Sequence, residues 1–229
     1  QAQKNLTDYC ISLLKPLRNK EVLEIGCGNG IQALYINAGH NPSTITGIDL
    51  NKANIDIANS EKAGTNAGNV SFFVGNAQKL TQIESDSIDV LLNIESAFHY
   101  PDKVSFLSEV HRVLKPGGEF LIADILSTRK KREGIMKLWG KPMVHHFWNL
   151  ERYQQEFLKS ELNLERTEDI SQLVRKGWSL YRNWLPKIKM QLFFQNIAFR
   201  IFYVINARIN IHFLNKRQQY IIFVGSKPG

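Results

Sequence analysis

The hydrophobic residues of this chain form short runs that alternate with longer amphipathic stretches. The short runs are rich in leucine and β-branched residues, as strands are: EVLEI at 21–25, TITGID at 44–49, VSFFVG at 70–75, IDVLLNI at 88–94 and EFLIAD at 119–124. Between them, stretches bounded by glycine and proline predict helices at about 30–39, 51–63 and 102–114. This alternation favours an α/β fold, with a parallel sheet covered by helices on both faces.

The alternation of strand-like and helix-like stretches ends after Asp124. A polar, basic and aromatic stretch is followed by a strand-like segment at 162–170, a long mixed helical region and a final apolar run, QQYIIFVGSKP. The chain contains no internal repeat and no low-complexity linker. We therefore expect one domain in three parts: residues 1–126, a largely helical insertion at 127–215 and a last strand at 216–229.

The chain carries a net charge of +8 over 229 residues, of which 43% are hydrophobic. This length and hydrophobic content suffice for a domain with a sizeable core. The positive charge favours nucleic acid, an acidic membrane surface or acidic metabolites as partners. Because the charges are scattered and RKKR at 129–132 is the only dense cluster, a basic surface that serves solubility is an equally good interpretation.

Two cysteines, Cys10 and Cys27, are too few for a disulfide framework or a CxxC metal site. A reducing, cytoplasmic setting is therefore expected. The most hydrophobic region, residues 190–214, is repeatedly interrupted by Gln, Asn and Arg, whereas a membrane span needs a run of about 20 apolar residues. We predict no transmembrane helix.

The segment VLEIGCGNG at 22–30 places three glycines in five positions directly after a predicted strand. It is not the dinucleotide fingerprint GxGxxG, because Ile31 stands where the third glycine would be, and no GxxxxGK[ST] phosphate loop is present. Glu24 precedes the turn and Asp49 ends the second predicted strand, where a carboxylate can hold ribose hydroxyls. A pocket formed by two carboxylates and a glycine-rich backbone suits a ligand with ribose and positive charge, such as S-adenosylmethionine. It suits pyrophosphate poorly, because pyrophosphate is negatively charged.

Several motifs in order make a family resemblance plain. VLEIGCGNG, GIDLN, FFVGNAQKL and LKPGGEFLIAD resemble the successive motifs of class I S-adenosylmethionine-dependent methyltransferases, over about residues 20–126. The resemblance implies a Rossmann-like, doubly wound, mostly parallel sheet with a final antiparallel strand, and S-adenosyl-L-methionine as cofactor. It also implies that residues 1–126 bind the cofactor and that 127–215 enclose the methyl acceptor.

The same resemblance implies a set of cofactor-contacting residues at the ends of the first four strands: Glu24, Gly26, Cys27, Gly28, Gly30, Asp49, Leu50, Asn76, Ala77, Gln78, Asn93 and Ile94. In the family, the residues matching Asp49 and Leu50 flank the ribose, and those matching 76–78 face the adenine. The family commonly has aspartate where this chain has Asn76. An amide both accepts and donates hydrogen bonds, so we expect the adenine pocket to persist with weaker affinity.

The segment NIESAFHYPD at 93–102 should lie beside the departing methyl group. It lacks the Pro-Pro-aromatic run typical of methylases of exocyclic base amines and the nucleophilic cysteine of pyrimidine C5 methylases. The surrounding block instead resembles small-molecule O-methyltransferases acting on sugars and polyketide-derived lipids, and more loosely sterol and tocopherol C-methyltransferases. On this match the candidates at the mouth of the active site are Glu95, His99 and Tyr100.

Histidine is the natural candidate for a general base, because an unperturbed imidazole titrates near neutral pH. His99 is the first candidate, although a surface or helix-capping role explains it equally well. His145 and His146, in PMVHHFWNL, compete for the role, and at most one of these adjacent residues can serve. No metal site is expected, because the histidines lack the i, i+4 spacing of HExxH and have no Cys or carboxylate companion.

The region from 136 to 213 is rich in aromatic residues, among which Trp148 and Trp178 are candidate acceptor contacts. A stripe at helical spacing in 193–205 is as well explained by ordinary core packing. Basic residues interleaved with the aromatics suit lipid headgroups or RNA phosphates, so peripheral membrane contact stays open.

These observations predict an enzyme that transfers a methyl group from S-adenosylmethionine to a hydroxyl of an apolar or amphipathic small molecule. Methylation of RNA, N- or C-methylation of a lipid-like molecule, and a non-catalytic module that has kept only the fold are the alternatives. Nucleic acid is the less favoured partner.

Overall fold

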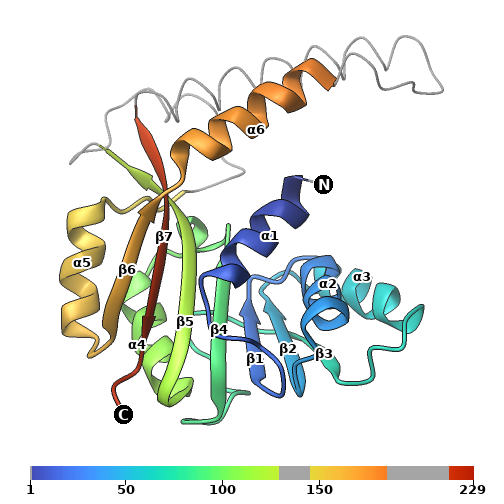
Figure 1. The fold of residues 1–229 in the computed structure, drawn as a ribbon. Helices are drawn as coiled ribbons and strands as arrows, with labels where there is room; N and C mark the ends of the chain where they lie inside the picture. Colours follow the sequence, from blue (N-terminus) through green and yellow to red (C-terminus); the bar gives the residue numbers. More distant parts are fainter. Residues whose placement is uncertain (1, 129–144, 185–216) are drawn as a thin grey trace.

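The computed structural model describes residues 2–128, 145–184 and 217–229 (Figure 1). The described chain forms one seven-stranded sheet in the order β3-β2-β1-β4-β5-β7-β6. The strands are β1 (Glu21–Ile25), β2 (Thr44–Asp49), β3 (Val70–Val74), β4 (Ile88–Ile94), β5 (Leu114–Ser127), β6 (Asn163–Asp169) and β7 (Gln218–Ser226). The pairs among β1 to β5 are parallel, and β7 is antiparallel to both of its neighbours. The predicted mostly parallel sheet with an antiparallel last strand is confirmed.

The three helices predicted at about 30–39, 51–63 and 102–114 are present within one or two residues of those positions, as α2, α3 and α4 of the helices given next. The described helices are α1 (Ala2–Ser12), α2 (Ile31–His40), α3 (Lys52–Ala63), the 3₁₀ helix η1 (Ala97–His99), α4 (Lys103–Val113), α5 (Leu150–Lys159) and α6 (Ser171–Trp184). Side-chain caps explain the starts of three of them: Asn51, Asp102 and Asn149 each accept a backbone N–H from the first turn that follows. The side chain at the helix start thus fixes where α3, α4 and α5 begin, whereas α2 starts at Gly30 without a side-chain cap.

Both faces of the sheet are buried. On β4, Val90 and Leu92 pack on one face and Leu91 on the other, as the two-residue period of a strand requires. Core residues of α1, α2 and α3 belong to the first face, and those of α4 and α5 to the second. Figure 1 shows the same division, with α4 behind the sheet and α1 to α3 in front of it. The predicted doubly wound architecture is confirmed.

β5 is longer than the predicted 119–124. Its pairing with β7 extends from Glu119 to Ser127, and its pairing with β4 continues back to Leu114 across an irregularity in register. The antiparallel partner supplies hydrogen bonds along nine consecutive residues of β5, which extends the strand beyond its apolar run.

The predicted insertion at 127–215 contributes α5, β6 and α6, so it also supplies the edge strand of the sheet. Residues 129–144 and 185–216 lie outside the described residues, and with them the RKKR cluster and the hydrophobic region 190–214. Among the helices that the structure describes, none combines the length and the apolar character that a membrane crossing requires.

Candidate active site

The glycine turn joins β1 to α2 at the carboxyl end of the sheet. Gly26, Gly28 and Gly30 have φ angles of +75°, +54° and +76°, a left-handed region that strains any residue with a side chain. The backbone N–H groups of Gly26 and Cys27 both donate to the carbonyl of Ile48, at 2.7 and 3.1 Å. The turn is thereby tied to the end of β2.

The three glycines serve different purposes. A Cβ added to Gly26 would overlap Ser96, and one added to Gly30 would lie 2.6 Å from the ring of Phe72, so both glycines permit close packing. A Cβ on Gly28 would meet no atom within 4 Å. Gly28 therefore borders open space, which a side chain would occupy and which a bound molecule can fill.

Asp49 lies at the junction of this turn and α3. Its carboxylate accepts hydrogen bonds from the backbone N–H of Gly28 at 2.9 Å, from the N–H of Asn51 at 2.8 Å and from the side-chain amide of Asn54 at 3.3 Å. The next residue, Leu50, has 73% of its surface exposed. A fixed carboxylate beside an uncovered apolar side chain suits a sugar with a flat, apolar base next to it.

The buried polar atoms without a hydrogen-bond partner among the described residues include two acceptors on adjacent strands: Oε2 of Glu24, on β1, and Oδ1 of Asn93, on the neighbouring β4. Glu24 is 2% exposed. Desolvation, and secondly the negative charge of Asp49, raise the pKa of Glu24 to about 8. Buried polar atoms are rarely left unpaired, so these acceptors fit a ligand that brings a cationic donor such as an ammonium group.

The segment predicted to face adenine is held by its own side chains. Oδ1 of Asn76 accepts from the backbone N–H of Gln78 at 2.9 Å, and Oε1 of Gln78 accepts from the N–H of Asp102 at 2.6 Å. Asn76 is exposed, whereas Ala77 is buried and Ile94 belongs to the core. Contact of residues 76–78 with adenine stays a prediction.

Glu95 follows β4 with a φ of +59°, an uncommon conformation for a residue with a side chain. Solvent reaches Glu95, yet surrounding protein atoms desolvate its carboxyl and raise its pKa, with Tyr220 beside it opposing the shift. Its charge also acts on Cys10 of α1. Glu95 therefore lies near Tyr220 of β7 and Cys10 of α1.

His99 and His145 come together at the same end of the sheet. Their ring centroids are 5.2 Å apart, and the rings of Phe98 and Phe147 flank them. Desolvation, followed by the positive charge of Lys103, lowers the pKa of His99. A lowered pKa favours the uncharged imidazole, which is the form able to accept a proton.

His146 differs from its neighbour because its backbone is held on both sides. Its N–H donates to the carbonyl of Phe98 at 2.7 Å, and its own carbonyl accepts from the ammonium of Lys103. The structure thus brings His145 to His99 and uses the His146 backbone to hold the connection.

The three predicted acceptor contacts lie in different surroundings. The hydroxyl of Tyr100 is bonded inside the protein, to Asn93 at 2.9 Å and to Ser96 at 2.8 Å. Trp148 is 6% exposed and packs edge-on against Tyr153. Trp178 belongs to α6, but its side chain is not among those described. Acceptor contact by these residues stays a prediction.

Sequence reasoning gave no role to Lys103, Asp124 and Tyr153, which form a buried polar cluster behind His99. Asp124 and Tyr153 bond to each other at 2.6 Å. Asp124 lies inside the apolar run LIADIL, and such a position could have indicated a buried carboxylate. Lys103 stands among ordinary helix-start residues, so the sequence does not indicate its burial.

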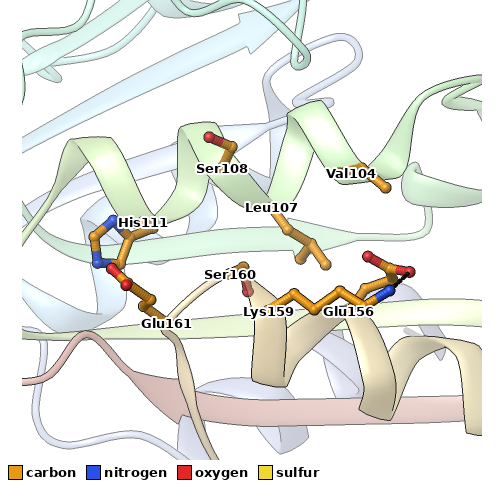
Figure 2. A pocket seen from close by; sticks show the side chains of 8 residues that line it. All are labelled: Val104, Leu107, Ser108, His111, Glu156, Lys159, Ser160 and Glu161. Carbon is orange, nitrogen blue, oxygen red and sulfur yellow. Dashed lines mark hydrogen bonds and ion pairs between the residues drawn. The ribbon is translucent and has the colours of Figure 1, made fainter.

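A cavity of about 300 Å³ lies elsewhere, between α4 and α5 (Figure 2). Its walls include His111 and the ion pair of Glu156 with Lys159. It belongs to the helix layer opposite α2 and α3 and contains none of the predicted site residues. The described residues hold no group of three or more His, Cys, Asp or Glu side chains arranged to bind a metal ion.

Comparison with known proteins agrees with this geometry. A family model described as "Methyltransferase domain" matches residues 17–172. A phthiotriol/phenolphthiotriol dimycocerosates methyltransferase of Mycobacterium leprae is 37% identical over 170 residues, which are 74% of this chain and 57% of the relative. A fatty-acid O-methyltransferase of Mycolicibacterium smegmatis is 41% identical over 172 residues, 75% of this chain and 60% of the relative. The chain thus spans less than two thirds of either relative.

Among solved structures, phosphoethanolamine N-methyltransferase 2 of Haemonchus contortus, in complex with S-adenosyl-L-methionine, superposes with a TM-score of 0.88. Its sequence identity is 18%, and the match covers 98% of this chain and 53% of that one. The glycine turn, Asp49 and the unpaired acceptors of Glu24 and Asn93 fit the ribose and the ammonium of that cofactor. The chain therefore belongs to the methyltransferase-domain family, and its fold is that of the class I S-adenosylmethionine-dependent methyltransferases.

Proposed function

We propose that this enzyme methylates a hydroxyl group on a lipid-like, apolar or amphipathic small molecule. The observation that carries the proposal is the position of the His99 imidazole at the strand ends, 5.2 Å from the ring of His145 and packed against Phe98. The names of two relatives, one acting on phthiotriol dimycocerosates and one on fatty acids, support a lipid-like acceptor.

When bound, S-adenosylmethionine supplies an electrophilic methyl group on a sulfonium. The acceptor oxygen would take that methyl group as the S–C bond breaks, and the imidazole of His99 would receive the hydroxyl proton. A positioned base of this kind contributes roughly a hundred- to ten-thousandfold to the rate. Alignment of the acceptor supplies more, because well-placed reactants gain about 7 to 11 kcal/mol over free ones.

The surroundings of His99 support an apolar acceptor. Phe98 and Phe147 are half-buried, and their rings, 6.2 Å apart, pack against the paired imidazoles. Helix α6 projects above the carboxyl ends of the strands (Figure 1), and its residue Leu173 is exposed. Apolar surface that is available at the mouth of a site is what a lipid chain needs.

The experiment is transfer of labelled methyl from S-adenosylmethionine into an organic-solvent extract of the source cells, with their RNA as a parallel acceptor. We expect label in the extract as a product that survives alkaline hydrolysis, because an ether survives whereas a methyl ester releases methanol. A labelled product that partitions as an amine, or label in RNA alone, would refute the proposal.

The role of His99 is tested by His99→Ala. We expect turnover to fall roughly a hundred- to ten-thousandfold, with cofactor affinity by calorimetry unchanged, because the proton acceptor is lost and the cofactor pocket is not. The matched control is His111→Ala, which removes an imidazole from α4 at the distant cavity and should leave turnover unchanged. Wild-type turnover in His99→Ala would remove His99 from the mechanism.

A further inference from the structure

A closed network of polar groups lies beside the glycine turn. Asn93, near the end of β4, is 0% exposed, and its side-chain nitrogen lies 3.1 Å from the backbone carbonyl oxygen of Ile25. The same nitrogen is 2.7 Å from Oγ of Ser96 and 2.9 Å from Oη of Tyr100. The two hydroxyl oxygens are 2.8 Å apart. Every member of the network therefore contacts at least two of the others.

The Ile25 carbonyl sets the direction of these hydrogen bonds. A carbonyl oxygen only accepts, so the atom of the Asn93 amide that faces it must be the nitrogen. The Ser96 hydroxyl donates its single proton to the same carbonyl, at 3.2 Å. The proton between the two hydroxyls therefore comes from Tyr100. Desolvation raises the pKa of Tyr100, which keeps that proton on its oxygen.

This arrangement leaves the other end of the Asn93 amide turned away from the network. Its Oδ1 is buried and has no hydrogen-bond partner among the described residues. Because the amide is planar, holding the nitrogen in the network also fixes the direction of the oxygen. A buried acceptor without a partner costs stability, so a role in the fold alone does not explain why this orientation is held so firmly.

The two hydroxyls also touch the glycine turn itself. A Cβ added to Gly26 would lie 2.3 Å from Oγ of Ser96 and 3.3 Å from Oη of Tyr100. The backbone of the turn therefore packs directly on the hydroxyls that hold Asn93. On the neighbouring strand β1, Oε2 of Glu24 is a second buried acceptor without a partner among the described residues. The network thus lies where the two unpaired oxygens and the turn come together.

We propose that Ser96 and Tyr100 are positioning residues of the cofactor site, whose hydroxyls hold the Asn93 amide so that its Oδ1 accepts from the ammonium group of S-adenosylmethionine. This gives Tyr100 a role in cofactor binding in place of the acceptor contact predicted from the sequence. The inference goes beyond the proposed function, because it depends neither on the acceptor nor on His99.

The test is Tyr100→Phe, which removes one oxygen and keeps the ring that packs edge-on against Phe106 at 5.0 Å. Calorimetry measures the dissociation constants of two ligands, S-adenosylhomocysteine and 5′-methylthioadenosine, which lacks the amino-acid part. We expect affinity for S-adenosylhomocysteine to fall at least fivefold and affinity for 5′-methylthioadenosine to stay within twofold, because only the former brings an ammonium group to Oδ1. The ratio of the two constants is decisive, since a general loosening of the pocket would weaken both ligands.

A second measurement uses the protein without any ligand. Hydrogen exchange of the Asn93 side-chain amide, followed by NMR, should be faster in Tyr100→Phe, because the nitrogen has lost one of its acceptors. The matched control is Tyr153→Phe, which removes another buried hydroxyl, one bonded to Asp124 at 2.6 Å. It should change neither the ratio of dissociation constants nor the exchange of the Asn93 amide.

An unchanged ratio in Tyr100→Phe, whether both affinities fall together or neither falls, would overturn the proposal. If Tyr100→Phe does not fold, Ser96→Ala decides by the same ratio, because it removes the other hydroxyl of the network. Failure of the base assignment is separate, since it appears as normal turnover in His99→Ala and does not affect the ratio of the two dissociation constants.

Discussion

Glu24→Gln is the substitution whose effect the structure predicts most directly. Glu24 is buried at the end of β1, one of its oxygens is unpaired, and its pKa is raised to about 8 by desolvation and by Asp49. The unfolded chain has no such environment, so its glutamate titrates near 4.5. Glutamine has the same shape and no charge, which isolates the effect of ionisation.

The direction follows from proton binding. Between pH 4.5 and about 8 the folded protein keeps a proton on Glu24 that the unfolded chain has released, so the wild type loses stability as pH rises through that window. At 1.36 kcal/mol per pH unit the loss is of the order of 2 kcal/mol at pH 6 and of the order of 5 kcal/mol above pH 8. The free energy of unfolding of Glu24→Gln minus that of the wild type should therefore increase by about 3 kcal/mol between pH 6 and pH 9.

Urea unfolding of both proteins without cofactor, at pH 6 and pH 9, measures this difference directly. Glu21→Gln is the control, because it removes the same charge from the other end of β1, where the side chain is 46% exposed and paired with Lys115. An exposed pair is worth about 0 to 1 kcal/mol. A stability difference between Glu24→Gln and the wild type that is the same at both pH values would show that Glu24 is ionised in the folded protein and refute the reasoning.

Two further predictions concern the cofactor pocket. Asp49→Asn should weaken S-adenosylmethionine binding at least tenfold by calorimetry, because the charged acceptor at the glycine turn is lost. The control Asp56→Asn, on the exposed face of α3, should leave that affinity unchanged. Equal affinities of the two variants would contradict the ribose role of Asp49. Of the two variants Gly28→Ala and Gly30→Ala, the first should show the larger loss of cofactor affinity, because its Cβ enters open space. Gly30→Ala should show the larger fall in melting temperature, because its Cβ meets Phe72. The opposite ranking of the two variants would disprove the distinction.

Much of the fold was readable from the sequence because its signals are local. The apolar runs at 21–25, 44–49 and 88–94 became strands at the same positions. Alternating helices dictated parallel pairing, since a parallel crossover needs a connecting segment of that length. The glycine turn and the carboxylate at Asp49 were predicted for the same reason: motif spacing along one chain places them at neighbouring strand ends.

Tertiary structure decided which of the polar residues face the site and which serve the interior. The sequence by itself predicted that Tyr100 and His99 follow β4 closely and that His145, His146 and Trp148 come after β5. Only packing buried Trp148, joined the Lys103 ammonium to the His146 carbonyl and joined the Tyr153 hydroxyl to Asp124. The physical reason is that these two hydrogen bonds join residues 43 and 29 positions apart, which no local pattern encodes, whereas strand and turn propensities act within a few residues.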